Sequence, residues 1–252
     1  MTRAWEQFRH ELATWQAEGL AARFWWRDDD ATGFTPALSR LLALQSATRA
    51  PLALALIPAQ AETELLVHEA KGLCMLQHGV DHVNRAAPGE KKSEFPARCD
   101  QDDHLARIIA ARRDLASRSS GRVLPVLVPP WNRINATLAT HLHAAGYRGL
   151  SGFGLELPGC NGLIQLNTHV DIVAWRRGKS FVGTDEVLGI ATTLLEQRRL
   201  GKAAHAPIGW LTHHAVHDGA AWDFLERLFA LTMTLSSVEW TGADAIFAAG
   251  NS

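Results

Sequence analysis

Cysteine is scarce in this sequence, with only Cys74, Cys99 and Cys160 among 252 residues. The three lie far apart, form no CxxC pair and leave an odd one over. Neither a disulfide framework nor a thiolate cage around a metal is indicated by this pattern. The scarcity fits a protein of the reducing cytoplasm.

A strong charge of either sign is also missing. The formal net charge is −1 at pH 7, and no long run of lysine and arginine occurs. Proteins that bind a nucleic-acid backbone carry concentrated positive charge. We therefore expect no nucleic-acid partner.

Long apolar runs are absent as well. The longest candidate, at 52–57, has the length of a strand, whereas a membrane helix needs about 18 apolar residues. The first turns of the chain mix charged and aromatic residues and lack the apolar core and cleavage site of a secretory signal. The sequence therefore predicts a soluble, cytoplasmic protein without a membrane span.

Histidine and tryptophan stand out in an otherwise ordinary composition of 47% hydrophobic and 20% charged residues. The length and this balance predict one globular domain over residues 1–252. The chain has 12 histidines and 9 tryptophans against a single tyrosine. Neutral imidazole is a common metal ligand and indole faces stack well on sugars, so their positions guide the search for a site.

Short apolar segments alternate with helical patterns along the chain. Residues 1–20 have apolar side chains at helical spacing and predict an N-terminal helix. We expect strands near 22–26, 52–57, 73–77, 123–128, 148–152, 163–166 and 208–212. We expect helices from 35 onward and near 61–71, 101–118, 135–145, 185–200 and 220–234. This alternation is typical of parallel βα units, so we predict a βα barrel, complete or incomplete.

Polar segments follow five of the predicted strands. In chain order these segments read RDDDA, QHGVDH, PPWNR, NTHVD and THHAVHD. In parallel βα barrels the carboxyl ends of the strands share one face, where active sites are found. Side chains distant in the sequence are therefore expected to converge there.

Three adjacent carboxylates, Asp28, Asp29 and Asp30, follow the first predicted strand. Such carboxylates repel one another unless a cation or an arginine neutralises them. Because side chains alternate along a strand, we expect one metal ligand, one base, and one that points outward or bonds to a helix N-terminus. Read alone, the triplet is more typical of a solvated turn.

His78 and His82 are four residues apart, so both imidazoles can reach one ion if the chain forms a helical turn after Gly79. Two nitrogens and one carboxylate leave positions open for water and substrate, as catalytic metals require. The same donor set also serves ferrous iron in oxygen chemistry. That alternative ranks last because it gives no role to the additional carboxylates.

The PPWNR turn carries three candidate substrate contacts, Trp131, Asn132 and Arg133. A buried turn is the competing interpretation. Together with Trp175, Trp131 is a candidate stacking wall for a sugar ring. The polar loop 86–103 either borders the site or is an exposed connection.

Asp171 is placed to orient a histidine or an arginine. His213 and His214 are adjacent at a strand end and point in opposite directions, so at most one faces the pocket directly. We favour His213, and His214 remains a candidate substrate contact.

Taken in order, the segments RDDDA, HGVDH, VPPWN, THVD and LTHH resemble the five motifs of the polysaccharide deacetylases, the NodB-like carbohydrate esterases. The resemblance spans residues 23–218 and is specific as an ordered set. It implies a distorted (β/α)7 barrel. It also implies one divalent metal, most commonly zinc, with cobalt, nickel or manganese as alternatives.

The resemblance assigns roles to individual residues. Asp30, His78 and His82 would hold the metal, Asp29 would be the general base and His213 the general acid. An alternative register places the acidic pair on Asp28 and Asp29.

One departure from the family pattern concerns an arginine. The third motif of the family usually begins with an arginine that orients the catalytic aspartate, and this chain has Val128 there. Arg27 or Arg133 could supply the charge instead. A divergent branch of the family is therefore indicated.

The expected reaction is the removal of an N- or O-linked acetyl group from a carbohydrate or a similar small acylated substrate. The missing export signal favours a small molecule or a linked sugar over a cell-wall polymer. The alternative is a module that keeps the fold and binds metal or sugar without chemistry.

Overall fold

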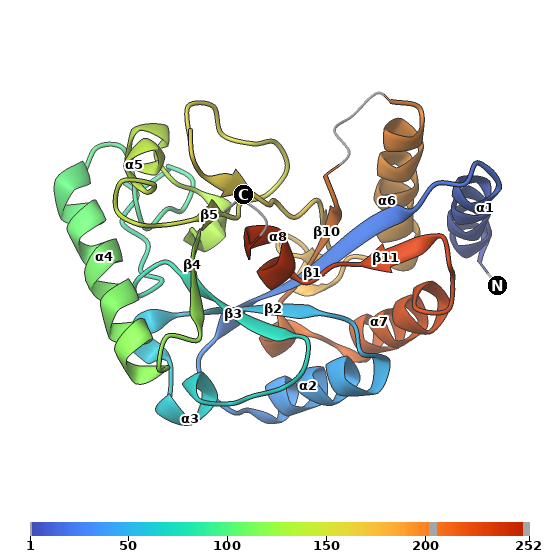
Figure 1. Cartoon of the computed structure of the whole chain (residues 1–252), viewed down its shortest axis with the longest axis horizontal. Coiled ribbons are helices and arrows are strands. Elements are labelled where there is room, and N and C mark those ends of the chain that lie inside the picture. Colours follow the sequence, from blue (N-terminus) through green and yellow to red (C-terminus); the bar gives the residue numbers. More distant parts are fainter. Residues whose placement is uncertain (1, 202–205, 249–252) are drawn as a thin grey trace.

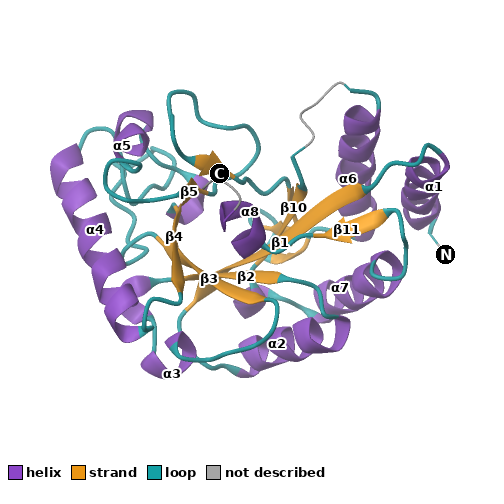
Figure 2. Cartoon of the chain, in the orientation of Figure 1, coloured by secondary structure: helices purple, strands orange, loops and turns teal. Residues whose placement is uncertain are grey.

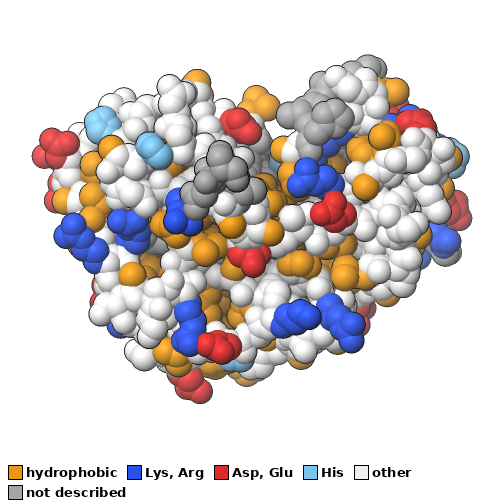
Figure 3. Space-filling model, in the orientation of Figure 1, with side chains coloured by type: hydrophobic (Ala, Val, Ile, Leu, Met, Phe, Trp, Pro, Cys, Tyr) orange, Lys and Arg blue, Asp and Glu red, His pale blue; other side chains and the backbone are white. Residues whose placement is uncertain are grey.

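The computed structural model describes residues 2–201 and 206–248. Within these ranges, none of the helices combines the length and the apolar character needed to cross a membrane. On the face shown in Figure 3, basic and acidic side chains are interspersed and no single area of one sign dominates.

A curled parallel sheet forms the centre of the molecule (Figure 1). Its main path runs β6-β5-β4-β3-β2-β1-β10-β7, and β11 also pairs with β1. The strands are β1 (Ala22–Ala31), β2 (Leu52–Leu56), β3 (Leu73–His78), β4 (Val123–Val128), β5 (Gly149–Leu150), β6 (Ile164–Gln165), β7 (Val170–Asp171), β10 (Ile208–Thr212) and β11 (Val238–Trp240). In the described ranges no ladder joins β6 to β7, so the barrel is incomplete there. The predicted distorted (β/α) barrel is confirmed.

Helices surround this sheet (Figure 2). They are α1 (Arg3–Ala17), α2 (Pro36–Thr48), α3 (Thr63–Leu66), α4 (Gln101–Arg118), α5 (Ala136–His141), α6 (Thr184–Arg199), α7 (Gly219–Thr232) and α8 (Ala243–Ala248). Short 3-10 turns follow several strands, namely η1 (Pro58–Gln60), η2 (Pro130–Asn132) and η3 (His214–Val216). A small antiparallel hairpin pairs β8 (Val173–Ala174) with β9 (Ser180–Phe181).

Two helices are shorter than the sequence patterns predict. Only Leu65 and Leu66 of α3 are buried, so the segment 61–71 has no apolar stripe long enough to hold a longer helix against the sheet. The helix expected at 135–145 ends at His141 and continues as turns toward Gly146, whose φ is +84°. The strands β7, β8, β9 and β11 were not predicted, because two or three residues show no periodicity.

The inside and the outside of the barrel have different side chains. Small and branched residues such as Ala53, Ala55 and Leu76 fill the interior beside Trp25. The C-terminal helix α8 lies in the middle of the view in Figure 1 and adds Phe247 to this interior cluster. The outward-facing strand residues pack against the helices in a larger second cluster.

Candidate active site

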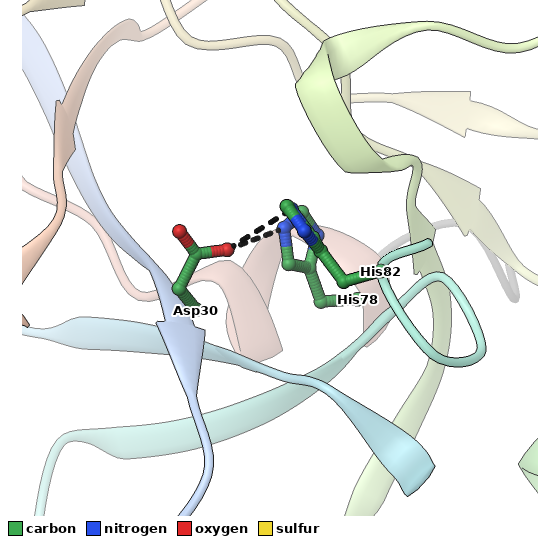
Figure 4. Close-up of side chains that lie close together, drawn as sticks. All are labelled: Asp30, His78 and His82. Atoms are coloured by element: carbon green, nitrogen blue, oxygen red, sulfur yellow. Dashed lines mark hydrogen bonds and ion pairs between the residues drawn. The ribbon is translucent and has the colours of Figure 1, made fainter. Parts of the chain in front are cut away.

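Asp30, His78 and His82 converge at the carboxyl ends of β1 and β3 (Figure 4). Asp30 Oδ1 lies 3.1 Å from His78 Nε2 and 3.2 Å from His82 Nε2. Two ligand atoms bound to one tetrahedral zinc ion are roughly 3.3 Å apart, because each is about 2.0–2.1 Å from the metal. The spacing of these three donors therefore fits a small divalent ion.

The orientation of His78 also fits a metal ligand. Its Nδ1 lies 3.0 Å from the carbonyl oxygen of Val128, which can only accept a hydrogen bond. Nδ1 therefore carries a proton, and Nε2, which faces Asp30, is the nitrogen that would ligate a metal once it is deprotonated. Tautomer and ring orientation are thus fixed by the backbone of the neighbouring strand β4.

The electrostatic environment of the cluster favours the charged forms of Asp30 and His78. Burial alone would raise the pKa of Asp30, but the hydrogen bond and charge of His78, with the charges of His213 and His82, hold it well below its usual range. Burial would lower the pKa of His78, and the carboxylates of Asp29 and Asp30 outweigh it and raise the pKa. A bound cation would take over the role of this positive charge.

Alternation and one bulge in β1 determine where each acidic side chain points. Arg27 and Asp29 lie two residues apart and make contact, while Asp28 points to the opposite face. Three steps along β1 from Asp28 to Ala31 match only two steps along β2, which marks a bulge. Asp30 lies in this bulge with φ +69°, so its side chain returns to the site beside that of Asp29.

Arg27, and not Arg133, contacts Asp29. Arg27 Nε donates to Asp29 Oδ1 at 2.8 Å and Nη2 donates to Oδ2 at 3.0 Å, a bidentate pair with both side chains buried. The guanidinium also donates to Asn132 Oδ1 at 2.6 Å and to Ser151 Oγ at 2.6 Å. The Arg133 side chain instead donates to the carbonyl of Lys92 at 2.9 Å.

The third carboxylate, Asp28, is bonded away from the site. It accepts hydrogen bonds from the His214 ring at 2.5 Å, the His214 backbone N–H at 3.0 Å and Thr212 Oγ1 at 2.7 Å. Burial would raise the pKa of Asp28, but the charge and hydrogen bond of His214 outweigh it and lower the pKa. The expected bond from one carboxylate to the start of a helix is found here, at η3.

The expectation that His214 contacts substrate is wrong. Its side chain is buried and its ring is bonded to Asp28 on the far side of β1. Strand alternation therefore turns His213 toward the site and His214 away from it, as favoured from the sequence.

His213 faces the carboxylate of Asp29. Its Nε2 lies 3.9 Å from Asp29 Oδ2, and within the described residues its Nδ1 has no hydrogen-bond partner. Its ring packs edge-on against Trp175, with the ring centroids 4.6 Å apart. The site therefore has an imidazole beside Asp29 whose Nδ1 is not held by a hydrogen bond in the described part of the chain.

Asp171 reaches His213 only through Trp175. Its Oδ2 accepts from Trp175 Nε1 at 2.8 Å and its Oδ1 accepts from the backbone of Val173 at 2.9 Å. Burial raises the pKa of Asp171, while the charge of His213 and these two hydrogen bonds act in the opposite direction. The residue expected to orient a histidine or arginine directly thus holds the indole that contacts the histidine.

The two candidate stacking tryptophans both lie beside site histidines. Trp131 has its ring centroid 4.4 Å from that of His82, and Trp175 is 42% exposed. Trp131 has φ +54°, in the left-handed region, so the backbone of the PPWNR turn is strained there. Asn132 was expected to contact substrate. Its side chain instead accepts a hydrogen bond from Arg27 and helps to position that arginine.

The loop between His78 and His82 is not the helical turn predicted from their spacing. Gly79 and His82 have φ of +61° and +57°, and a Cβ on Gly79 would lie 2.2 Å from Glu94 Oε2. The buried carboxylate of Glu94 accepts the backbone N–H groups of Val80 at 3.1 Å and Asp81 at 3.0 Å. Glu94 therefore replaces the helical hydrogen bonds that would have held this turn.

Glu94 and Ser151 are site residues that sequence reasoning did not identify. Glu94 lies inside the polar loop 86–103, and no pattern in that loop distinguishes it from the other charged residues there. Ser151 could have been noticed, because it lies near the carboxyl end of the predicted strand at 148–152, which ends on the same face. Its hydroxyl accepts from Arg27 and donates to the carbonyl of Leu166.

Solved structures with the same fold are found, although no family model and no curated protein matches this chain. The deacetylase T48 with substrate is 14% identical, with a TM-score of 0.57 over 92% of this chain and 93% of that chain. A family 4 carbohydrate esterase from Streptomyces lividans in complex with acetate is 14% identical, with a TM-score of 0.53 over 86% and 90%. The allantoinase Puue is 13% identical, with a TM-score of 0.63 over 90% and 89%.

These likenesses confirm the family resemblance at the level of the fold. The chain has the NodB-like barrel of the polysaccharide deacetylases, with divergent sequence. A fold shared with both deacetylases and an allantoinase does not by itself select a reaction.

Proposed function

We propose that this protein is a metal-dependent hydrolase that removes an acetyl group from a carbohydrate or a similar small acylated substrate. The observation that carries the proposal is the juxtaposition of two units. One is the donor set of Asp30, His78 and His82, and the other is a buried carboxylate, Asp29, held by Arg27. A structural metal site would need no such base beside it.

Asp30, His78 and His82 would hold one divalent ion, with zinc favoured by two imidazoles and one carboxylate. Cobalt, nickel and manganese are the alternatives. Such an ion supplies Lewis-acid polarisation of the scissile carbonyl and acidifies water. The cytoplasmic location expected from the sequence remains a prediction.

The chain's own residues would handle the protons. Asp29 would accept a proton from the attacking water, with Arg27 fixing both carboxylate oxygens so that the base keeps one orientation. His213, across the site, would donate a proton to the leaving amine or alcohol. Trp175 packs against His213 and would limit its rotation.

An inactive binding module is the second candidate, and the absent arginine at Val128 made it conceivable. The bidentate contact from Arg27 to Asp29 weakens that argument, because the orienting charge comes from another strand position. An allantoinase has the same fold. Allantoin therefore belongs among the substrates to be tested.

The test is acetate release from N-acetyl and O-acetyl sugars by the purified protein, before and after chelation and after zinc is restored. We expect release that chelation abolishes and metal restores. Asp29→Asn should lower kcat by roughly 10²–10⁴-fold without loss of metal. Activity that survives both chelation and Asp29→Asn would contradict the proposal.

A further inference from the structure

A cavity of about 520 Å³ lies beside the site on the same face of the barrel. Its walls come from the segments that follow β3, β4 and β5, namely parts of 86–97, 129–135 and 150–157. Two groups that hold Arg27, the Asn132 side chain and the Gly152 carbonyl, belong to residues that line it. This side cavity is therefore separated from Asp29 by little more than the Arg27 guanidinium, and its volume is typical of a small-molecule site.

The uncharged polar side chains around the side cavity are already hydrogen-bonded to other parts of the chain. Gln165 bonds to the backbone N–H and carbonyl of Leu157, both at 2.7 Å. Asn167 accepts from Gly152 at 2.7 Å and donates to Leu155 at 2.9 Å. Asn135 caps α5 through Thr137. These amides stabilise the 150–157 segment and are not themselves free to bind sugar hydroxyls.

The charged residues Glu90, Lys91 and Arg133 also line the side cavity. Most of its other lining residues are apolar, and part of this apolar lining faces solvent. Phe95, Ile134 and Leu150 line the side cavity. Phe153 is 45% exposed and Leu155 is 92% exposed, although both also line it. Exposed large apolar side chains that surround a cavity are typical of a surface that a ligand covers.

We propose that the side cavity binds an apolar substituent of the substrate, an alkyl or aryl group attached to the acylated sugar or amine. This inference rests on the proposed function, because the reacting acyl group must lie at Asp29 while the apolar group enters the side cavity. It separates this protein from enzymes that act on fully hydrophilic glycan chains, which carry no apolar group to fill the side cavity.

Binding and turnover are tested with matched pairs of ligands. The dissociation constants of octyl and methyl β-glucoside are measured by calorimetry, below the micelle concentration of the octyl compound. Neither ligand carries an acyl group, so this arm needs no turnover. Acetate release is then measured for the octyl and methyl glycosides of N-acetylglucosamine.

We expect the octyl glucoside to bind at least about tenfold more tightly, because each buried methylene favours binding. The Phe153→Ala/Leu155→Ala variant should lose most of this difference. The matched control Ile190→Ala/Leu200→Ala, which removes exposed apolar side chains on and beside α6, should keep it.

Equal binding of the two glucosides by the wild type would overturn the inference, as would an undiminished octyl preference in the Phe153→Ala/Leu155→Ala variant. Acetate released equally from the octyl and methyl glycosides would contradict the inference and leave the proposed function standing. An octyl preference in binding without release of acetate from any substrate would contradict the proposed function alone.

Discussion

Replacing Arg27 by lysine should disable the base while the protein remains folded. Arg27 is fully buried and donates six hydrogen bonds, two of them to the two oxygens of Asp29. Lysine keeps the positive charge but cannot form the bidentate pair or reach Asn132 and Ser151 at the same time. The carboxylate would keep a counter-charge and lose its fixed orientation.

The expected size of the effect follows from these contacts. Loss of hydrogen bonds to charged groups costs about 1.5–3 kcal/mol each, and the new ammonium recovers part of that, so Arg27→Lys should lower the free energy of unfolding by roughly 2–3 kcal/mol. A mispositioned general base should lower kcat/KM by about 10²-fold or more. Arg27→Met, which leaves the Asp29 charge buried and unpaired, should cost about 3–5 kcal/mol of stability.

The assay combines urea unfolding with acetate release by each folded variant. Arg198→Lys is the matched control, because Arg198 is also buried, at 6% exposure, and none of its contacts is with a residue of the site. In Arg27→Met, the second change Asp29→Asn should restore part of the lost stability, because the two charges are removed together. Wild-type kcat/KM in Arg27→Lys would refute the reasoning that Arg27 positions the base.

Three further predictions concern other parts of the molecule. His213→Ala should lower kcat by about 10²–10⁴-fold without loss of bound metal, and an unchanged kcat would remove its role as acid. Glu94→Ala should weaken metal binding about 10–100-fold, because the loop that carries His82 loses its acceptor, and titration with zinc measures this. Burial and the charge of Arg198 lower the pKa of His169 to about 4. As the pH drops below about 6.5, His169 is protonated in the unfolded chain before it is protonated in the folded protein, so the free energy of unfolding falls. Between pH 7 and 5 the wild type should therefore lose about 2 kcal/mol more than His169→Asn, and equal losses in urea unfolding would contradict this.

The parts of the fold that could be predicted are those with strong periodicity. The helix at 101–118 and the strands at 123–128 and 208–212 were predicted with the observed bounds, because each is long enough to show its period and is bounded by turn residues. The short strands β7, β8, β9 and β11 could not be predicted, whereas β5 and β6 lie within the predicted strands at 148–152 and 163–166. The unpredicted strands are stabilised by pairing with neighbouring strands, and a local sequence pattern contains no information on that pairing.

The site was partly predictable for a related reason. Strand ends place Asp30, His78 and His213 on one face, so the sequence alone brings them together. The pairing of Arg27 with Asp29 follows from strand alternation, whereas the return of Asp30 to the same site depends on a bulge that no local pattern indicates. The hydrogen bonds from the loop after His78 to Glu94 depend on a long loop folding back, which no local sequence signal indicates.

Arg27 accounts for the departure from the family pattern at Val128. The charge that orients the base comes from two residues before it on the same strand, and Val128 instead contributes its carbonyl oxygen to His78. An arginine at a different position in the sequence can therefore orient the same carboxylate, provided that its guanidinium reaches it.

The central claim is that Asp30, His78 and His82 hold one divalent ion. The most direct test is the metal content of the purified protein by plasma mass spectrometry, in the wild type, in His78→Ala/His82→Ala, and in the control His141→Ala/His143→Ala, whose two histidines are exposed. We predict about one ion per chain in the wild type and the control, and none in His78→Ala/His82→Ala. A wild type that binds no metal even after supplementation, or a double variant that retains it, would contradict the account.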